Sequence, residues 1–321
     1  MKHYLLYLVL STAVFLNSCE KEVTIDLPVT DQYVVVEGKI EQGQFPLVIL
    51  TRSIPYYTEL NNQTLANMFV TDAQVSITID GKVIPLDKIC LSEIGDTAII
   101  KEVGEMLNLP SGFKDFCIFS SINPALTGTP GKTYQLTVQA DGKTLTSSTR
   151  IPEPVPLDSL WFKPDGKTDS LGFIYARLTD PPGRGNAYRW FARRINRFTF
   201  GREVGKIKDN DFVAPFNSAF DDEFFDGLSF PFAYNRGRTP GAKQEDDEND
   251  ERGYFKTGDT VLVKFTTIDA GVYQYYRSYY NSIASSGSPF ASPANIKTNV
   301  TGGLGIWAGY GVSLDTLIIK N

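Results

Sequence analysis

The chain has 321 residues, a hydrophobic fraction of 42% and a formal net charge of −6 at pH 7. This composition predicts a folded globular protein and argues against a nucleic-acid partner, because phosphate binding requires a positively charged surface. The length allows two domains or one large β domain.

A lipoprotein signal is predicted at the N-terminus. The apolar stretch 4–16 is too short to span a bilayer and is typical of a signal-peptide core. Leu16-Asn17-Ser18-Cys19 follows in the order of a bacterial lipobox. We therefore expect residues 1–18 to be a signal peptide, with Cys19 carrying the acyl chains at the head of a tether, 19–31. No later segment is long and apolar enough to cross a membrane, so this lipid is the only anchor that the sequence offers.

The first residues after the cysteine bear on which membrane face the protein occupies. Glu20, Lys21 and Glu22 give the mature protein a charged, acidic start. Such a start resembles the surface-export signals of Bacteroidota lipoproteins, and the alternative is a short solvated tether. We expect an outer-membrane lipoprotein that contacts the bilayer through Cys19 and faces the exterior.

Histidine is missing from the expected mature chain. The only histidine, His3, lies in the signal peptide. Its removal excludes Ser-His-Asp and Cys-His catalysis and any His-ligated zinc or iron site. It also removes the usual general base near neutral pH. We therefore expect a non-enzymatic protein without a cofactor.

The first half of the chain is predicted to be an immunoglobulin-like β-sandwich, residues 32–150. Candidate strands lie at 33–40, 47–51, 74–79, 82–86, 97–103, 116–120, 134–140 and 143–150. Asp80-Gly81 and Asp141-Gly142 each separate two β runs, which is a strong hairpin signal. Short strands punctuated in this way favour an antiparallel sandwich.

Alternating prolines at 151–157 predict a semi-rigid linker and a domain boundary. The second domain, 158–321, is also predicted to be mainly β. Candidate strands lie at 159–162, 172–178, 187–199, 260–268 and 315–319. One helix is expected after Asp269, a suitable N-cap residue, and it ends before Gly287. The poorly patterned segment 201–258 is predicted to be a long functional or disordered insertion.

Cys90 and Cys117 both lie in apolar runs. Two thiols without further ligands cannot form a tetrahedral zinc site. A disulfide is compatible with an oxidising compartment, and two separately buried thiols fit the sequence equally well.

An acidic run in the insertion is a candidate calcium site. Its carboxylates are those of Glu245, Asp246, Asp247, Glu248 and Asp250. Calcium takes six to eight oxygen ligands, but the run lacks the spacing and the turning glycine of an EF-hand. Like charges in a block are usually a solvated, mobile segment, which is the alternative.

Tyrosines cluster on the expected helix and are candidates for an interface. Tyr273, Tyr276 and Tyr280 would supply large contact area at low entropic cost. They could equally stack on sugar rings. Because the helix carries tyrosines around its whole circumference, core packing must account for some of them.

Five triplets of Asp, then Ser or Thr, then an apolar residue resemble the O-glycosylation motif of exported Bacteroidota proteins. The acceptor residues would be Thr97, Ser159, Ser170, Thr260 and Thr316. The alternative is that these triplets are ordinary strand starts.

Several segments, taken in order, resemble one known family. They are Ser18–Glu22 with the sequence SCEKE, 25–28 IDLP, 34–40 VVVEGKI, 131–138 GKTYQLTV, 151–152 IP, 158–160 DSL, 289–293 PFASP and 302–307 GGLGIW. Their order and spacing are similar to those of domain of unknown function 4249, a family of Bacteroidota lipoproteins. The resemblance implies an outer-membrane setting and a TonB-dependent receptor as partner, since family members are often encoded beside one. The family has no established activity, so the resemblance implies no catalytic residues.

These observations favour a non-enzymatic accessory or ligand-binding subunit of a TonB-dependent uptake system. The first alternative is a carbohydrate- or peptide-binding lipoprotein acting alone, and the second is a glycan hydrolase that uses two carboxylates. A broad apolar patch would favour a receptor partner, an exposed aromatic platform would favour a binder, and a carboxylate pair in a deep pocket would favour the enzyme.

Overall fold

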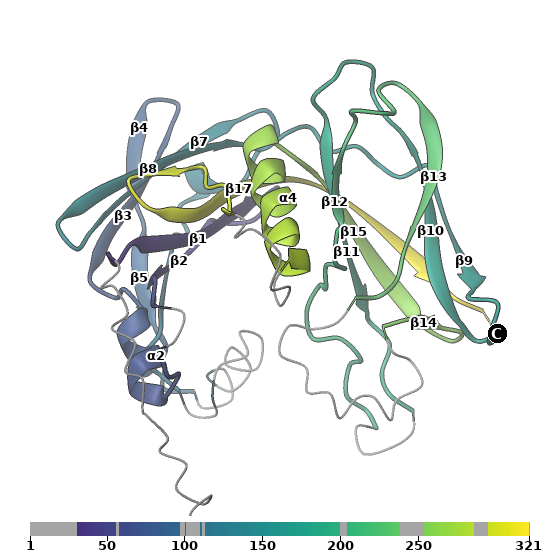
Figure 1. The fold of residues 1–321 in the computed structure, drawn as a ribbon, viewed down its shortest axis with the longest axis horizontal. Coiled ribbons are helices and arrows are strands. Elements are labelled where there is room, and N and C mark those ends of the chain that lie inside the picture. Colours follow the sequence, from purple (N-terminus) through teal and green to yellow (C-terminus); the bar gives the residue numbers. More distant parts are fainter. Residues whose placement is uncertain are drawn as a thin grey trace, which may run out of the picture. The chain divides into compact units, whose positions relative to one another are not determined.

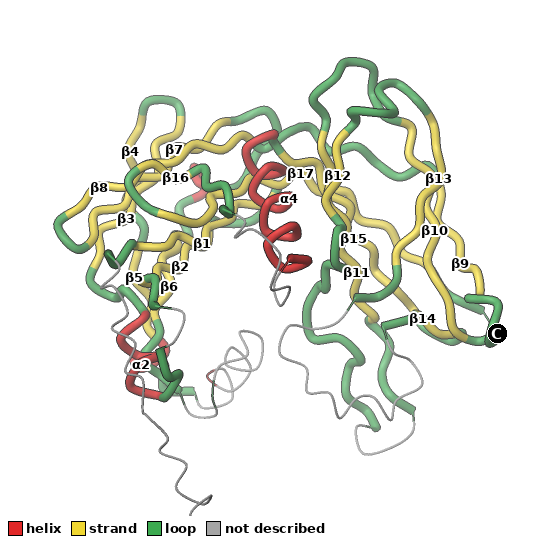
Figure 2. The backbone as a smooth tube through the Cα atoms, viewed as in Figure 1, coloured by secondary structure: helices red, strands yellow, loops and turns green. Residues whose placement is uncertain are grey.

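The structure is a computed structural model that describes residues 31–55, 58–96, 100, 110, 113–199, 204–237, 253–285 and 295–320. Residues from Gln32 onward form one compact unit. This unit is mainly β, as predicted, with two α-helices among the described residues (Figures 1 and 2).

The strands, in chain order, are β1 (Val34–Glu41), β2 (Leu47–Arg52), β3 (Ala73–Ile79), β4 (Lys82–Pro85), β5 (Asp87–Cys90), β6 (Cys117–Ser120), β7 (Thr133–Ala140), β8 (Lys143–Arg150), β9 (Ser159–Pro164), β10 (Leu171–Thr179), β11 (Ala187–Arg194), β12 (Ala219–Asp221), β13 (Ser229–Tyr234), β14 (Phe255–Lys256), β15 (Thr260–Ile268), β16 (Val300–Thr301) and β17 (Leu304–Ile318). The helices are α2 (Asn62–Met68) and α4 (Ala270–Ser285).

One eight-stranded sheet runs through the whole unit, in the order β12-β11-β15-β17-β1-β2-β6-β5. The long strand β17 joins its two halves. The first part of β17 pairs in parallel with β1, and the rest pairs antiparallel with β15 (Figure 1). β17, the last strand of the chain, is therefore a central strand of this sheet and lies next to β1, the first strand.

Two smaller sheets pack against this long sheet. The five-stranded sheet β16-β8-β7-β3-β4 covers the half that contains β1 and β2, and we call this pair the N-terminal sandwich. The sheet β13-β10-β14, with β9 paired to β10, covers the half that contains β11 and β15, and we call this pair the C-terminal sandwich. On β17, Trp307 enters the first core and Leu317 packs against the second. Because both positions are odd-numbered in one strand, the two cores form on the same face of the long sheet.

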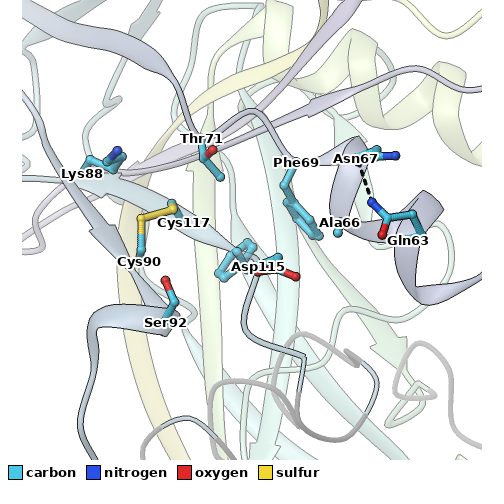
Figure 3. Close-up of a pocket in the computed structure, with 11 residues that line it drawn as sticks. Gln63, Ala66, Asn67, Phe69, Thr71, Lys88, Cys90, Ser92, Asp115 and Cys117 are labelled. Atoms are coloured by element: carbon cyan, nitrogen blue, oxygen red, sulfur yellow. Dashed lines mark hydrogen bonds between the residues drawn. A yellow bond between two sulfur atoms is a disulfide. The ribbon is translucent and has the colours of Figure 1, made fainter.

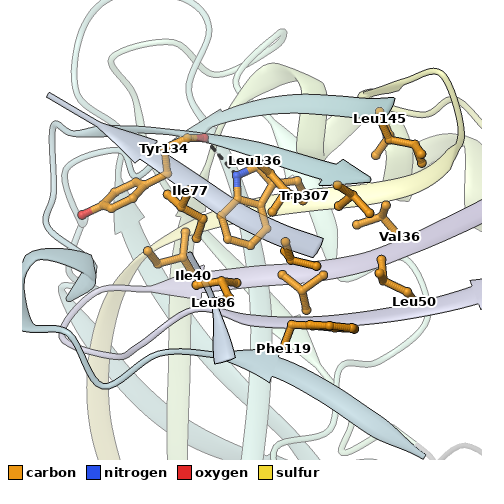
Figure 4. Close-up of a cluster of buried hydrophobic side chains, with 14 of the residues drawn as sticks. Val36, Ile40, Leu50, Ile77, Leu86, Phe119, Tyr134, Leu136, Leu145 and Trp307 are labelled. Atoms are coloured by element: carbon orange, nitrogen blue, oxygen red, sulfur yellow. Dashed lines mark hydrogen bonds between the residues drawn. The ribbon is translucent and has the colours of Figure 1, made fainter. Parts of the chain in front are cut away.

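Trp307 is the centre of the N-terminal core, where aliphatic side chains of both sheets surround it (Figure 4). Its indole is fully buried, and Nε1 donates to the carbonyl oxygen of Tyr134 at 2.9 Å. Gly38 lies opposite it on β1, where a Cβ atom would come within 2.7 Å of the indole. Gly38, the glycine of the run VVVEGKI, is therefore needed to leave room for the Trp307 indole.

Both predicted hairpins are confirmed. Asp80-Gly81 connects β3 to β4, and Asp141-Gly142 connects β7 to β8. All four residues have positive φ, between 47° and 77°, which is the conformation that a type I′ turn requires.

Residues 151–157 do not form the predicted linker between two separate domains. Ile151 is fully buried, and the backbone N–H of Val155 donates to Thr267 on β15. At Gly311 a Cβ atom would lie 2.2 Å from the carbonyl oxygen of Pro152, so the proline segment runs directly against β17. The predicted division also fails at the other end, because β16 and β17 lie in 158–321 but complete the N-terminal sandwich. A boundary read from prolines alone misses strands that return from far along the chain.

The insertion predicted at 201–258 is partly built into the fold. Its described residues include β12, β13 and β14, which extend two of the sheets. Phe220, Phe230 and Phe232 from this region pack against the C-terminal core. Phe230, Phe232 and Tyr234 alternate along β13, a strand signal that the sequence analysis missed, whereas β12 and β14 are too short to give one.

Helix α4 lies on the face of the long sheet opposite the two cores. Val272 packs there with Ile268, Ile306 and Tyr310. The predicted N-cap is confirmed, since the Asp269 side chain accepts from the backbone N–H of Val272 at 2.9 Å. Helix α2, which the sequence reading did not predict, is a two-turn helix capped by Asn61.

Candidate functional site

Several predicted site residues lie outside the described part of the chain. They are Cys19, the acidic residues Glu245, Asp246, Asp247, Glu248 and Asp250, and the candidate glycosylation residue Thr97. Among the described residues, no helix has both the length and the hydropathy that crossing a bilayer requires.

Cys90 and Cys117 form a disulfide. They are directly opposite each other on the antiparallel strands β5 and β6, with Cα atoms 4.0 Å apart. The bond joins residues 27 positions apart at the edge of the long sheet. The sequence left open a disulfide or two separate thiols, and the structure has the disulfide.

The disulfide lies at the base of an open pocket with a cavity volume of about 400 Å³ (Figure 3). Phe69 and Phe116 meet edge to face beside it, with ring centroids 4.9 Å apart. The rim is polar: Gln63 Nε2 donates to Asn67 Oδ1 at 3.1 Å, and Asp115 and Lys88 line the opening. The polar groups of this lining can form hydrogen bonds with water or with a small polar ligand.

The three tyrosines predicted as an interface do not share one exposed surface. Tyr280 is 6% exposed, and its hydroxyl lies 3.2 Å from that of Ser218, so it is a core residue and the prediction is wrong for it. Tyr276 and Tyr273 are half-buried, and the Tyr276 hydroxyl bonds that of Tyr310 at 2.7 Å. The most exposed tyrosine of α4 is Tyr279, at 38%.

Tyr279 belongs to a small aromatic surface that we call the α4 patch: Tyr275, Tyr279 and Phe216. The rings of Tyr275 and Tyr279 are nearly parallel, with centroids 6.1 Å apart. Phe216 is 51% exposed and packs edge to face on the buried Tyr280. The helical period places Tyr275 and Tyr279 one turn apart on the same side of the helix.

Arg189 fixes α4 to the sheet through aromatic rings. Its guanidinium carbon lies 3.6 Å from the ring centroid of Tyr276 and 4.6 Å from that of Phe191. No carboxylate within the described ranges pairs with it. Cation–π contacts of this kind stabilise a desolvated charge by about 2 kcal/mol. Tyr276 is therefore engaged in holding the helix and offers little to a partner.

Three carboxylates of the C-terminal sandwich, those of Asp180, Asp222 and Asp226, have oxygen atoms within 4.8 Å of one another. Each is already used by the protein. Asp222 accepts from the backbone N–H groups of Gly185 and Asn186, and Asp226 accepts from Gly183. Asp180 accepts from the hydroxyl of Tyr188, and burial together with this bond raises the pKa of that tyrosine. The cluster thus ties the loop after β10 to the loop after β12.

Ion pairs are buried in or beside the C-terminal sandwich. Arg194 and Asp209 meet at 2.9 Å, both nearly inaccessible to solvent. Lys264 on β15 reaches Glu41 on β1 at 3.0 Å. Burial alone would raise the pKa of Glu41, but attraction to Lys264 and Lys39 outweighs it and holds that pKa below its ordinary value. Burial lowers the pKa of Lys264, and the attraction to Glu41 offsets only part of that.

The described candidate glycosylation residues differ in access. Ser159 in β9 and Thr316 in β17 are exposed, whereas Ser170 and Thr260 are half-buried. Ser159, Thr260 and Thr316 lie within strands. Ser159 and Thr260 are the first residues of β9 and β15, as expected if these triplets are ordinary strand starts.

The outer face of sheet β13-β10-β14 carries a row of aromatic side chains that we call the aromatic stripe: Trp161, Tyr175, Phe173 and Tyr254. Trp161 and Tyr175 are opposite each other on β9 and β10 and stack with centroids 5.7 Å apart and planes at 25°. Phe173 meets Tyr254 edge to face at 5.3 Å. All four are half-buried, whereas the alternate residues of β10, such as Ile174 and Ala176, are fully buried in the core.

Sequence reasoning predicted both strands of the stripe but not their outward residues. The available signal was the alternation of β10, in which aromatic Phe173 and Tyr175 occupy the positions where a solvated face usually has polar residues. Trp161 follows the same rule on β9. Both strands therefore carry large apolar side chains on the outward face as well as in the core, and that property marks a surface available for contact.

The family resemblance is confirmed by comparison with known families. The model of the family described as Domain of unknown function (DUF4249) matches residues 20–315, which is most of the chain. None of the curated proteins compared with the chain matches it. The chain belongs to the DUF4249 family.

Proposed function

We propose that this chain is an outer-membrane lipoprotein, anchored by Cys19 and facing the exterior, that acts as a non-enzymatic ligand-binding subunit of a TonB-dependent uptake system. The observation that carries the binding role is the aromatic stripe. Half-exposed aromatic rings in a row on a rigid antiparallel sheet present large contact area at little entropic cost.

The location rests on the lipobox and on the charged residues that follow it. Lipidation would confine the protein to the plane of the membrane, where a receptor in the same bilayer meets it at high effective concentration. Several acyl chains hold a protein firmly, whereas one chain holds it only weakly.

The α4 patch is a suitable contact for the receptor. It lies on the face of the long sheet opposite the cores, whereas the stripe lies on the outer side of a sheet that covers one core. Aromatic anchors in a desolvated patch supply much of the binding energy at protein interfaces. With two separate surfaces, one compact unit can hold a receptor and a ligand together.

The hydrolase alternative has less support among the described residues. The clustered carboxylates of Asp180 and Asp222 are buried and accept hydrogen bonds from the protein itself. A stand-alone carbohydrate- or peptide-binding lipoprotein is the second candidate, and the aromatic stripe favours it equally, so the receptor must be tested directly.

Native purification tests the proposal. The lipoprotein, tagged after Asn321 and expressed at its native level, is extracted from outer membranes in mild detergent. We expect a TonB-dependent receptor to copurify in a fixed ratio. Cys19→Ala should lose both membrane anchoring and the receptor, and Tyr279→Ala should lose the receptor alone. Phe224→Ala, at an exposed loop position, is the matched control and should retain it. Recovery of the wild-type lipoprotein without a receptor would contradict the subunit role.

A further inference from the structure

We infer that the aromatic stripe binds an acidic polysaccharide, whose sugar rings stack on Trp161 and Tyr175 and whose carboxylates pair with Lys163 and Arg177. This inference rests on the binding role proposed above and names the ligand class. The argument uses the register of three strands, the orientation of the rings and the distribution of charge on this face.

The register places Trp161 and Tyr175 side by side on the outer face of the sheet. Tyr175 on β10 lies between Trp161 on β9 and Ala233 on β13. Alanine leaves the ring of Tyr175 uncovered on that side, while Trp161 extends it on the other. Phe173 is two residues further along β10, about 7 Å away, and lies opposite Lys163.

The planes of the Trp161 and Tyr175 rings make an angle of 25°, and their centroids are 5.7 Å apart. Together the two half-buried rings form an apolar surface that the C–H face of a pyranose ring can contact. A deep pocket would instead favour a single small molecule. β9 pairs with β10 and lies at the edge of this sheet (Figure 1).

The charge of this face is opposite to that of the whole chain. Lys163 and Arg177 are exposed on this face, and the Lys163 ammonium lies over the Tyr175 ring, 4.7 Å from its centroid. No outward-facing position of β9, β10 or β13 carries a carboxylate, although the chain has a net charge of −6. The nearest acids flank β9, where Asp158 accepts from Thr179 and Asp165 accepts from the amides of a turn.

Cations placed at a stacking surface select an anionic ligand. A carboxylate next to a stacked sugar ring would meet the Lys163 ammonium, and Arg177 can bind a second one in a bidentate manner. A neutral glycan would gain the stacking but would leave both cations unpaired. An acidic peptide would gain the ion pairs but has no succession of rigid rings to cover Trp161 and Tyr175.

Calorimetric titration of the full-length lipidated protein in mild detergent tests the inference. The probes are polygalacturonate, its fully methyl-esterified form, which keeps the rings and loses the charge, and polyglutamate. We expect polygalacturonate to bind at least roughly tenfold more tightly than either of the other two. Absence of polygalacturonate binding, or equal binding of polyglutamate, would overturn the ligand class.

Variants assign the binding to the stripe. Trp161→Ala should weaken polygalacturonate binding by roughly tenfold or more. The double variant Lys163→Gln, Arg177→Gln should remove the preference over the methyl ester. Phe224→Ala and Lys82→Gln, at exposed positions outside the stripe, are the matched controls and should bind as the wild type does. An unchanged affinity in Trp161→Ala, with an unchanged unfolding midpoint, would overturn the site. Receptor copurification is measured separately, so its failure and the failure of glycan binding are distinguishable.

Discussion

The N-terminal sandwich fills its core mainly with aliphatic side chains around Trp307, whereas the C-terminal sandwich uses clustered aromatic rings and has buried ion pairs at its margin. The two also differ on their outer faces. The outward residues of β8 in the first are polar or charged, whereas those of β9 and β10 in the second include the aromatic Trp161, Phe173 and Tyr175. The first sandwich has a packed core and a polar outer face, whereas the second has a packed core and also presents a surface for contact.

The largest expected effect is on the stability of the N-terminal sandwich. Trp307→Ala should lower the free energy of unfolding by about 3–5 kcal/mol, because it leaves a cavity in a fully buried site and removes the bond to Tyr134. Chemical denaturation measures this change. A loss below about 1 kcal/mol would mean that the N-terminal core does not depend on this residue.

The buried charges of the second sandwich give a comparable prediction. Asp209→Ala leaves the Arg194 guanidinium in a site that is 3% exposed, and we expect a loss of about 3–5 kcal/mol. Lys132→Ala breaks the exposed pair with Asp80 and should cost about 1 kcal/mol or less. Equal losses in the two variants, measured by denaturation, would remove the distinction between buried and exposed pairs.

A smaller loss of stability is expected when the space beside the Trp307 indole is filled. Gly38→Ala places a methyl group within 2.7 Å of the Trp307 indole, and the resulting overpacking should cost about 1–3 kcal/mol. Gly95→Ala meets no atom within 4 Å and is the matched control, with little expected change. If both variants unfold at the wild-type denaturant concentration, the packing of β1 against β17 is looser than described.

The Glu41–Lys264 pair, which connects the two halves of the long sheet, gives a prediction that depends on pH. The folded-state pKa of Glu41 lies below its ordinary value, so its contribution is present above the unfolded pKa and is lost as the pH falls through the folded one. Unfolding measured from pH 7 down to pH 3 should show wild type and Glu41→Gln converging below about pH 4.5. Parallel curves would show that Glu41 titrates alike in both states.

Local features of the fold were predictable from the sequence. The Asp-Gly hairpins, the strand at 260–268 and the Asp269 cap depend on neighbouring residues, and the structure has them. Long-range features were not predictable in this way. The pairing of β1 with β17 joins residues almost 270 positions apart, and strand patterning does not encode its partner. Gly305, Gly309 and Gly311 within one strand were a usable signal, since glycines at alternate positions mark the close approach of another backbone.

The candidate site was predictable only in part. The tyrosines of α4 were recognised, but amphipathic spacing could not show that Arg189 and Ser218 would engage Tyr276 and Tyr280 from other elements. The aromatic stripe was missed because a strand with aromatic residues on both faces also fits complete burial. Only the sheet order places β9 and β10 where one face remains open to solvent.

The most direct test of the contrast between the buried core and the contact surface is the unfolding free energy of Trp161→Ala. Trp161 stacks on Tyr175 and is half-buried, so we expect a loss of about 1 kcal/mol or less. That value would be well below the loss in Trp307→Ala and would agree with a side chain kept for contact. A loss of 3 kcal/mol or more would show that Trp161 is part of the core and would contradict the assignment of this face to a ligand.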